Sequence, residues 1–119
     1  MECIFCRIIN KELPADVVFE DDMIMAFNDI NPAAPIHILI IPKIHIGSVN
    51  ELKSDDDLLA GRIITVAKEL AKEKGIAEGG YKLLFRVGRH GGQEVPHIHL
   101  HLIGGAQLTE GIHAVDKKN

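Results

Sequence analysis

The chain has 119 residues, of which 46% are hydrophobic and 25% charged, so we expect a single domain over residues 1–119 with one buried core. Its formal net charge of −4 argues against a general nucleic-acid-binding protein, because such proteins carry basic patches that attract phosphates. The longest apolar run, residues 36–42, is too short to cross a bilayer, and the N-terminus lacks a signal-peptide pattern. We therefore expect a cytoplasmic protein with no membrane partner.

The first predicted element is a short N-terminal helix. Ile4, Phe5 and Ile8 share one face at helical spacing, and Pro14 stops the pattern. Core packing explains this apolar face as well as a binding role does. The same stretch carries a Cys-x-x-Cys arrangement, which in a reducing compartment indicates metal or redox chemistry rather than a structural disulfide.

Residues 16–20 and 23–28 read as two strands around an acidic Asp-Asp turn, and this pattern predicts a β-hairpin. The chain then enters a turn-rich loop at residues 27–32. Asp29 in this loop has two interpretations. Its carboxylate either forms the turn before Asn-Pro or accepts hydrogen bonds from ribose hydroxyls.

Residues 36–42 predict a central strand that is covered on both faces, with His37 near its start. Three acidic residues then follow Ser54, which predicts that Ser54 is the N-cap of one long amphipathic helix. Apolar residues recur along this helix at the helical period, and Gly75 provides its C-terminal stop. Residues 81–87 predict the next strand, antiparallel to the last one.

The last predicted strand, residues 97–103, alternates histidines with apolar residues. His97, His99 and His101 would share one face, about 6.6 Å apart from one to the next. Neighbouring rings could therefore hold one phosphate, while the outer two serve different sites. A packing role alone explains the three rings poorly, because every buried ring nitrogen needs a partner. The preceding loop, residues 88–95, offers glycine N–H groups that can form an anion nest.

Residues 91–105, with the pattern His-φ-His-φ-His-φ-φ, resemble the signature of the histidine-triad nucleotide-binding family, most closely its bacterial purine nucleoside phosphoramidase branch. The resemblance covers residues 3–105 and leaves a polar tail at residues 106–119. It implies an α+β fold with an antiparallel sheet of about five strands, one long helix and a short N-terminal helix. It also implies a homodimer that pairs the long helices and the strands at residues 81–87.

The resemblance further implies an enzyme that cleaves purine nucleoside phosphoramidates, or related AMP and GMP conjugates, at the α-phosphate. His99 would attack phosphorus and form a nucleotidyl-histidine intermediate, with no metal needed for the chemistry. His101 would hydrogen-bond the phosphoryl oxygens or protonate the leaving group, and His37 would orient a catalytic ring. The nucleotide contacts that the family implies are Ile4, Phe5, Ile8, Phe27, Asp29, Ile30, Arg86, Gly92, Gln93, Glu94, Val95, His99 and His101.

Cys3, Cys6, His45 and His97 form a candidate Cys₂His₂ set of tetrahedral zinc ligands. Bacterial members of the family that resemble this chain in its Cys-x-x-Cys, and in a histidine after a Pro-Lys step, hold a structural zinc, so the resemblance implies one here. The alternative is a pair of small apolar helix residues with His45 at the surface. If the zinc site forms, His97 belongs to the metal and not to the chemistry.

Two residues of this chain deserve separate attention. Arg86 stands where members of the family usually carry Asn, and it either brings a fixed positive charge to the phosphate or pairs with Glu94. The Glu94 carboxylate should favour an amine leaving group over a polyphosphate, because like charges repel at close range.

Two other functional classes remain open from the sequence. The same histidines could serve a nucleotide-binding or interaction module with little turnover. They could also serve a purely metal-binding protein. Turnover separates the enzyme from both.

Overall fold

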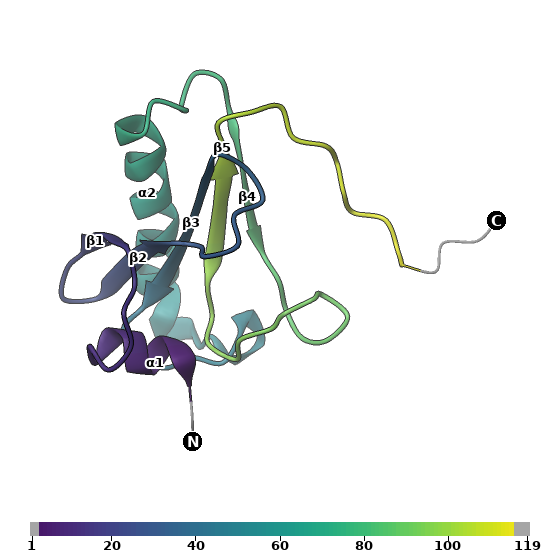
Figure 1. The fold of residues 1–119 in the computed structure, drawn as a ribbon. Helices are drawn as coiled ribbons and strands as arrows, with labels where there is room; N and C mark the ends of the chain where they lie inside the picture. The colour runs from purple at the N-terminus through teal and green to yellow at the C-terminus, as the bar shows by residue number, and fades with distance from the viewer. Residues whose placement is uncertain (1–2, 116–119) are drawn as a thin grey trace.

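The computed structural model describes residues 3–115. Five strands form one antiparallel sheet in the order β1-β2-β3-β5-β4, and two α-helices and two short 3₁₀ turns complete the fold (Figure 1). This arrangement confirms the predicted α+β class. The elements are α1 (Ile4–Ile9), β1 (Val17–Glu20), β2 (Ile24–Asn28), β3 (Ile36–Pro42), η1 (Val49–Glu51), η2 (Ser54–Asp56), α2 (Asp57–Glu73), β4 (Tyr81–Phe85) and β5 (Leu100–Gly104).

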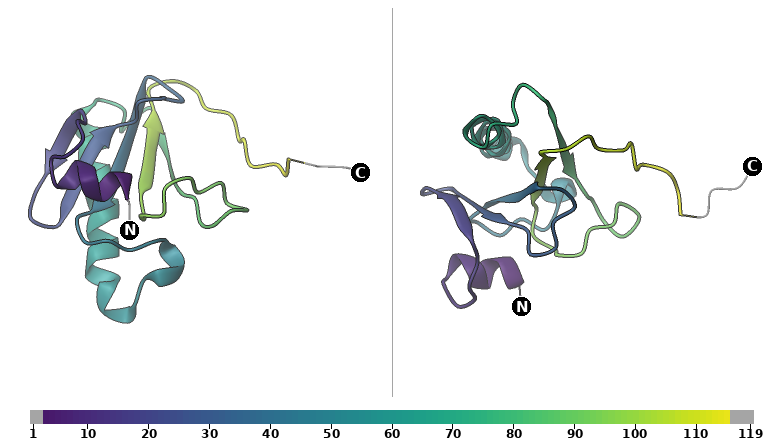
Figure 2. Two further views of the ribbon diagram at one scale, coloured as in Figure 1. Left: turned by 60° about the horizontal axis from the view of Figure 1, so that its bottom comes forward. Right: turned by 45° about the horizontal axis from the view of Figure 1, so that its top comes forward.

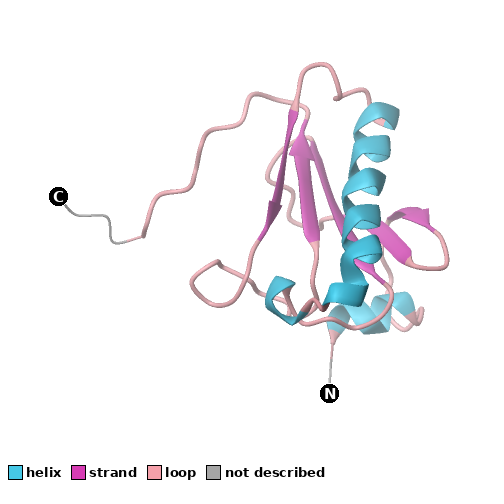
Figure 3. Cartoon of the chain, turned by 180° about the vertical axis from the view of Figure 1, so that it is seen from behind, coloured by secondary structure: helices cyan, strands magenta, loops and turns pink. Residues whose placement is uncertain are grey.

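The helices α1 and α2 lie on opposite faces of the sheet (Figures 2 and 3). Each face carries its own apolar cluster, because side chains alternate between the two faces. Ile38, Ile40 and Leu102 are fully buried on the face that α2 covers. Leu39 and Ile41, which alternate with them along β3, pack with α1 on the opposite face. The central position of β3 and its burial on both faces are confirmed.

The start of the long helix differs from the prediction. Ser54 begins the 3₁₀ turn η2, and α2 starts only at Asp57. The carboxylate of Asp56 accepts a hydrogen bond from the backbone N–H of Lys53 at 2.9 Å. The side chain that binds a backbone N–H at this end of the helical segment is therefore an aspartate and not Ser54. The predicted stop is confirmed, because Gly75 has φ +77, a conformation that favours glycine.

The last strand is shorter than predicted, and this changes the surroundings of the histidines. β5 begins at Leu100, so His97 and His99 precede it. Pro96 has no N–H, the N–H of His97 donates to the carbonyl of Val95, and the N–H of Ile98 donates to Ile46. These bonds replace strand pairing before Leu100, and the prediction of one continuous strand over residues 97–103 was therefore wrong.

Beyond β5 the chain leaves the sheet and extends away from it, as Figure 1 shows. Lys82 Nζ holds the start of this segment by donating to the carbonyls of Thr109 and Glu110, at 2.6 and 3.2 Å. Residues 116–119 of the predicted tail, like residues 1 and 2, lie outside the described residues. Neither α1 nor α2 has the length and apolar composition that a membrane-spanning helix requires.

Candidate active site and metal cluster

A cleft of about 640 Å³ brings together nearly all of the predicted nucleotide contacts. Its wall includes residues of α1, the loop after β2, the end of β4 and the segment before β5. The predicted residues that line it are Ile4, Phe5, Ile8, Phe27, Asp29, Ile30, Arg86, Gly92, Glu94, Val95, His99 and His101. Sequence reasoning missed five others, which are Pro14, Ala15, Asn28, Asn31 and Leu39.

One of the missed residues carried a usable signal. Leu39 lies two positions after His37 on β3 and pairs with His101 on β5, so strand alternation places it on the histidine face. Pro14 and Ala15 carried none, because the loop after α1 meets the cleft only once the chain is folded.

Gln93 is the one predicted contact that does not line the cleft. Its side-chain oxygen accepts from the N–H of Gly88 at 3.0 Å, and its Nε2 donates to the carbonyls of Gly47 and Val95 at 2.7 and 2.9 Å. All these bonds lie within the protein. Gln93 therefore shapes the glycine loop and ties it to the segment after β3.

His99 presents a ring nitrogen suited to nucleophilic attack. Its Nδ1–H donates to the carbonyl of His97 at 2.7 Å, which leaves the lone pair on Nε2. The Phe5 ring packs edge-on against the imidazole, with ring centroids 5.1 Å apart. The hydrogen bond and the aromatic contact together fix both the tautomer and the orientation of the ring.

A chain of hydrogen bonds sets the tautomer of His101. The N–H of Ala33 donates to His37 Nδ1 at 2.9 Å, so the ring proton of a neutral His37 is on Nε2. His37 Nε2 lies 3.0 Å from His101 Nδ1 and donates to it. The remaining proton of His101 is therefore on Nε2, a buried atom with no hydrogen-bond partner among the described residues. The cleft thus receives an N–H donor next to His99.

The same chain argues against a metal at these residues. Ligand atoms of Asp29, His37 and His101 lie within 4.8 Å of one another. A metal on His37 Nε2 would leave the ring proton on Nδ1, where it would oppose the N–H of Ala33. We therefore regard this cluster as a hydrogen-bond chain.

The cleft holds its imidazoles in the neutral form. Burial is the main cause that lowers the pKa of His37 and of His99. Burial also lowers the pKa of His101 to about 4, and His99, His37 and Arg86 add smaller contributions in the same direction. Neutral imidazole is the form that has a lone pair to offer.

Asp29 fits both of its predicted roles. Its Oδ1 accepts from the N–H of Asn31 at 2.8 Å, as in an Asx turn. Its Oδ2 lies 3.4 Å from His37 Nε2. Because the residue also lines the cleft, the turn places its carboxylate at the wall rather than away from it.

Arg86 and Glu94 line the cleft as separate charges. The alternative in which they pair is not seen, since no ion pair joins them among the residues described here. Arg86 follows β4 directly and lies against Gly92, on which a Cβ would be 3.6 Å from the Arg86 Nη1 atom.

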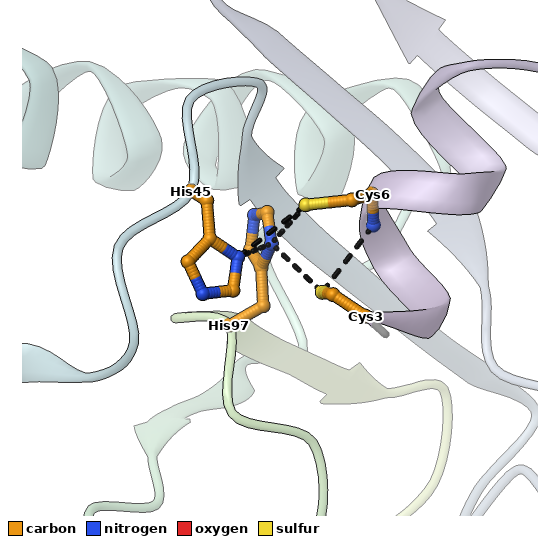
Figure 4. A group of neighbouring side chains, drawn as sticks. All are labelled: Cys3, Cys6, His45 and His97. Atoms are coloured by element: carbon orange, nitrogen blue, oxygen red, sulfur yellow. Dashed lines mark hydrogen bonds between the residues drawn. The ribbon is translucent and has the colours of Figure 1, made fainter. Parts of the chain in front are cut away.

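Four side chains from three distant segments meet in a second cluster (Figure 4). Cys3 Sγ lies 3.4 Å from His97 Nδ1, and Cys6 Sγ lies 3.3 Å from His45 Nδ1 and 3.6 Å from His97 Nδ1. The Nδ1 atoms of His45 and His97 are 3.2 Å apart. Burial, together with the neighbouring Cys3, raises the pKa of Cys6.

These distances fit a tetrahedral metal. Bonds of about 2.3 Å to sulfur and about 2.0 Å to nitrogen would separate S–N pairs by roughly 3.5 Å and N–N pairs by roughly 3.3 Å. His97 Nε2–H donates to the carbonyl of Pro42 at 2.9 Å, which leaves Nδ1 as the ligand atom. The backbone N–H of Cys6 donates to Cys3 Sγ at 3.4 Å. The donor set is therefore already oriented for a metal ion.

The fold and the cleft together define a small α+β protein with buried imidazoles at the wall of one cleft. The family model described as "Scavenger mRNA decapping enzyme C-term binding" matches residues 2–114. The chain is 53% identical over 107 residues to the purine nucleoside phosphoramidase of Escherichia coli strain K12, which is 90% of each protein. It is also similar to a HIT family hydrolase from Legionella pneumophila, with a TM-score of 0.91, 54% identity, and coverage of 92% of this chain and 98% of that one.

Protein HitA of Neisseria gonorrhoeae is 45% identical over 102 residues, which cover 86% of this chain and 94% of that protein. The chain belongs to the histidine-triad (HIT) family, and it is a hydrolase of that family.

Proposed function

We propose that the protein hydrolyses purine nucleoside phosphoramidates, or related AMP and GMP conjugates, through a nucleotidyl-histidine intermediate on His99. The observation that carries the proposal is the pairing of His99 Nε2, whose lone pair is available, with the unpartnered N–H of His101 in one cleft. The similarity to the purine nucleoside phosphoramidase of E. coli supports the substrate class.

In the first step His99 Nε2 attacks the α-phosphorus. A bond forms between phosphorus and Nε2, the bond from phosphorus to the leaving nitrogen breaks, and that nitrogen takes one proton from solvent. In the second step water attacks phosphorus, the electron pair returns to Nε2, and one proton is released. Division of one difficult displacement into two is the advantage of covalent catalysis.

Of the two roles predicted for His101, its surroundings favour hydrogen bonding to a phosphoryl oxygen. Because the pKa of His101 is lowered to about 4, its ring is neutral at pH 7, and a neutral ring that gave up its Nε2 proton would become an imidazolate. Donation of that N–H to the phosphoryl oxygen, where charge grows in the transition state, needs no such change. His37 contributes by holding the tautomer.

The base and ribose have a complementary wall. Phe5, Ile8 and Phe27 offer an apolar surface from α1 and β2, and Phe5 and Phe27 pack edge-on with centroids 5.4 Å apart. Asp29 offers a carboxylate for ribose hydroxyls. The backbone N–H groups of the loop that contains Gly92 complete the phosphate side.

We further propose that Cys3, Cys6, His45 and His97 hold a structural zinc ion. Zinc bound by four protein ligands leaves no open position, so it would stabilise the fold rather than take part in the reaction. Its ligands would link α1, which walls the cleft, to the segment that carries His99.

A homodimer is the third element of the proposal. In the described structure β4 pairs only with β5 and is one of the two edge strands of the sheet, the other being β1. Leu83 on β4 is 36% exposed, and Leu58 and Ile64 on α2 are 82% and 48% exposed. An open edge strand and exposed apolar residues on β4 and on α2 favour a second copy that pairs these elements.

The catalytic proposal is tested by intact-protein mass spectrometry after rapid mixing with adenosine 5′-phosphoramidate, together with steady-state assays of AMP release. We expect one transient nucleotidyl adduct per chain and turnover to AMP. The variant His99→Ala should show neither, and its circular-dichroism spectrum should show that it is folded. Tight AMP binding by the wild type without adduct or turnover would instead support the binding module.

A further inference from the structure

Arg86 is a cation without a partner inside the cleft. It lines the cleft with His99 and His101, and it forms no hydrogen bond or ion pair with any residue that the structure describes. Its side chain lies next to Gly92, where a Cβ would be 3.6 Å from the Nη1 atom and 3.7 Å from the Cδ atom of Arg86. Arg86 is exposed to solvent at this wall of the cleft, so its guanidinium can meet a bound ligand.

The order of the strands shows which part of a substrate Arg86 would meet. Along the sheet, β2 and β3 lie on one side of β5 and β4 lies on the other. The apolar wall of the cleft comes from α1, β2 and β3, whereas Arg86 follows β4 directly. His101 on β5 pairs with Leu39 of β3 on one side and with Leu84 of β4 on the other. The imidazole of His101 therefore lies between the apolar wall and Arg86.

This order separates the two ends of the substrate. If the base lies on the apolar wall and the α-phosphate lies at the histidines, the leaving group points toward Arg86. The guanidinium group binds carboxylates and phosphates through paired N–H donors, and on the leaving-group side the anion available to it is a carboxylate of the departing amine.

We propose that Arg86 determines specificity by binding an anionic group on the departing amine, so that the preferred substrates are nucleoside phosphoramidates of amino acids, joined through nitrogen with the carboxylate free. This inference rests on the phosphoramidase activity proposed above. Arg86 takes no part in breaking the phosphorus–nitrogen bond. It affects which leaving groups the enzyme prefers.

Glu94 lines the same cleft and opposes this preference, so the two charges have to be weighed. Arg86 lowers the pKa of His37, of His99 and of His101, whereas Glu94 raises the pKa of His99 alone among the three. The charge of Arg86 therefore acts on all three imidazoles of the cleft, and Glu94 opposes it at His99. Glu94→Gln should strengthen the preference for an anionic amine.

The test compares two substrates of nearly equal size, adenosine 5′-phosphoramidates of glycine and of glycinamide. The measured quantity is the ratio of their kcat/KM values. Arg86→Met removes the charge and keeps most of the side-chain length. Arg89→Met is the matched control, because Arg89 is, like Arg86, an exposed arginine after β4, but it does not line the cleft.

We expect the wild type to prefer the glycine conjugate about ten-fold, the scale of a charge-assisted pair. Arg86→Met should bring the ratio close to one, while Arg89→Met keeps it. Equal kcat/KM values for the two conjugates in the wild type, or an undiminished ratio in Arg86→Met, would overturn the inference.

Failure of the proposed activity would look different, since neither conjugate would release AMP. Calorimetric titration of the uncleaved conjugates then decides the role of Arg86. Tighter binding of the glycine conjugate by the wild type but not by Arg86→Met supports the inference, and equal affinities refute it.

Discussion

His37 Nε2 lies 3.0 Å from His101 Nδ1, and the proton between the two rings belongs to His37. The reason is the backbone N–H of Ala33, which occupies the other nitrogen of His37. A single backbone donor therefore decides, through two rings, that His101 presents an N–H to the cleft.

Replacement of His37 by Ala should lower kcat roughly 10- to 100-fold, the usual cost of losing a group that orients a functional ring. The His101 proton would then distribute over both ring nitrogens. Nitrogen-15 NMR of the imidazoles checks this directly, since the wild type should show His101 as the Nε2–H tautomer. A variant that keeps both the wild-type kcat and the single tautomer would contradict the hydrogen-bond chain.

The free energy of unfolding should decrease as the pH is lowered, over a range set by His101. Its pKa in the folded protein is about 4, below the usual 6.5, so the unfolded chain binds a proton more readily. The stabilisation is complete above about pH 6.5 and is lost as the pH falls through about 4. Urea unfolding at pH 7, 5 and 4 measures this loss, and His101→Gln should show a shallower decline than the wild type. Parallel declines for the two proteins would show that His101 does not contribute.

The metal cluster predicts one zinc ion per chain. Removal of zinc by a chelator should lower the melting temperature by about 10 °C, because binding to a folded site adds directly to stability. Cys6→Ser should bind little zinc and should melt at the lower temperature with or without chelator. Elemental analysis of the purified protein gives the stoichiometry, and a wild type that binds no zinc under reducing conditions would refute the site.

The homodimer predicts that a charge on the sheet edge weakens self-association. Leu83→Asp should shift the protein from dimer to monomer, since a buried carboxylate at the β4 edge would lack a partner. Sedimentation velocity over a concentration series measures the shift. Val17→Asp is the matched control, because Val17 is an apolar residue of similar exposure, 39%, on β1 at the opposite edge of the sheet, and it should leave the dimer intact. A monomeric wild type at micromolar concentration would exclude the dimer.

Local patterns determined most of the fold. The near-continuous apolar run in residues 36–42 predicted the buried central strand correctly, because successive side chains point to opposite faces and both faces of β3 meet an apolar cluster. The apolar spacing located the long helix, because residues that recur at the helical period form one face that must be buried. Gly75 located its end, because a residue with positive φ stops the helix. The triad motif itself indicated the family.

The tertiary structure decided what local pattern could not. His97 leaves the strand because Ile98 bonds to Ile46, a partner more than fifty positions earlier, and this turns the His97 ring to the cysteines instead of to the cleft. The tautomer of His101 depends on an N–H at Ala33, and Gln93 is drawn away from the cleft by carbonyls at Gly47 and Val95. Hydrogen bonds between distant segments have no periodicity in the sequence. They arise only when burial forces every polar atom to find a partner.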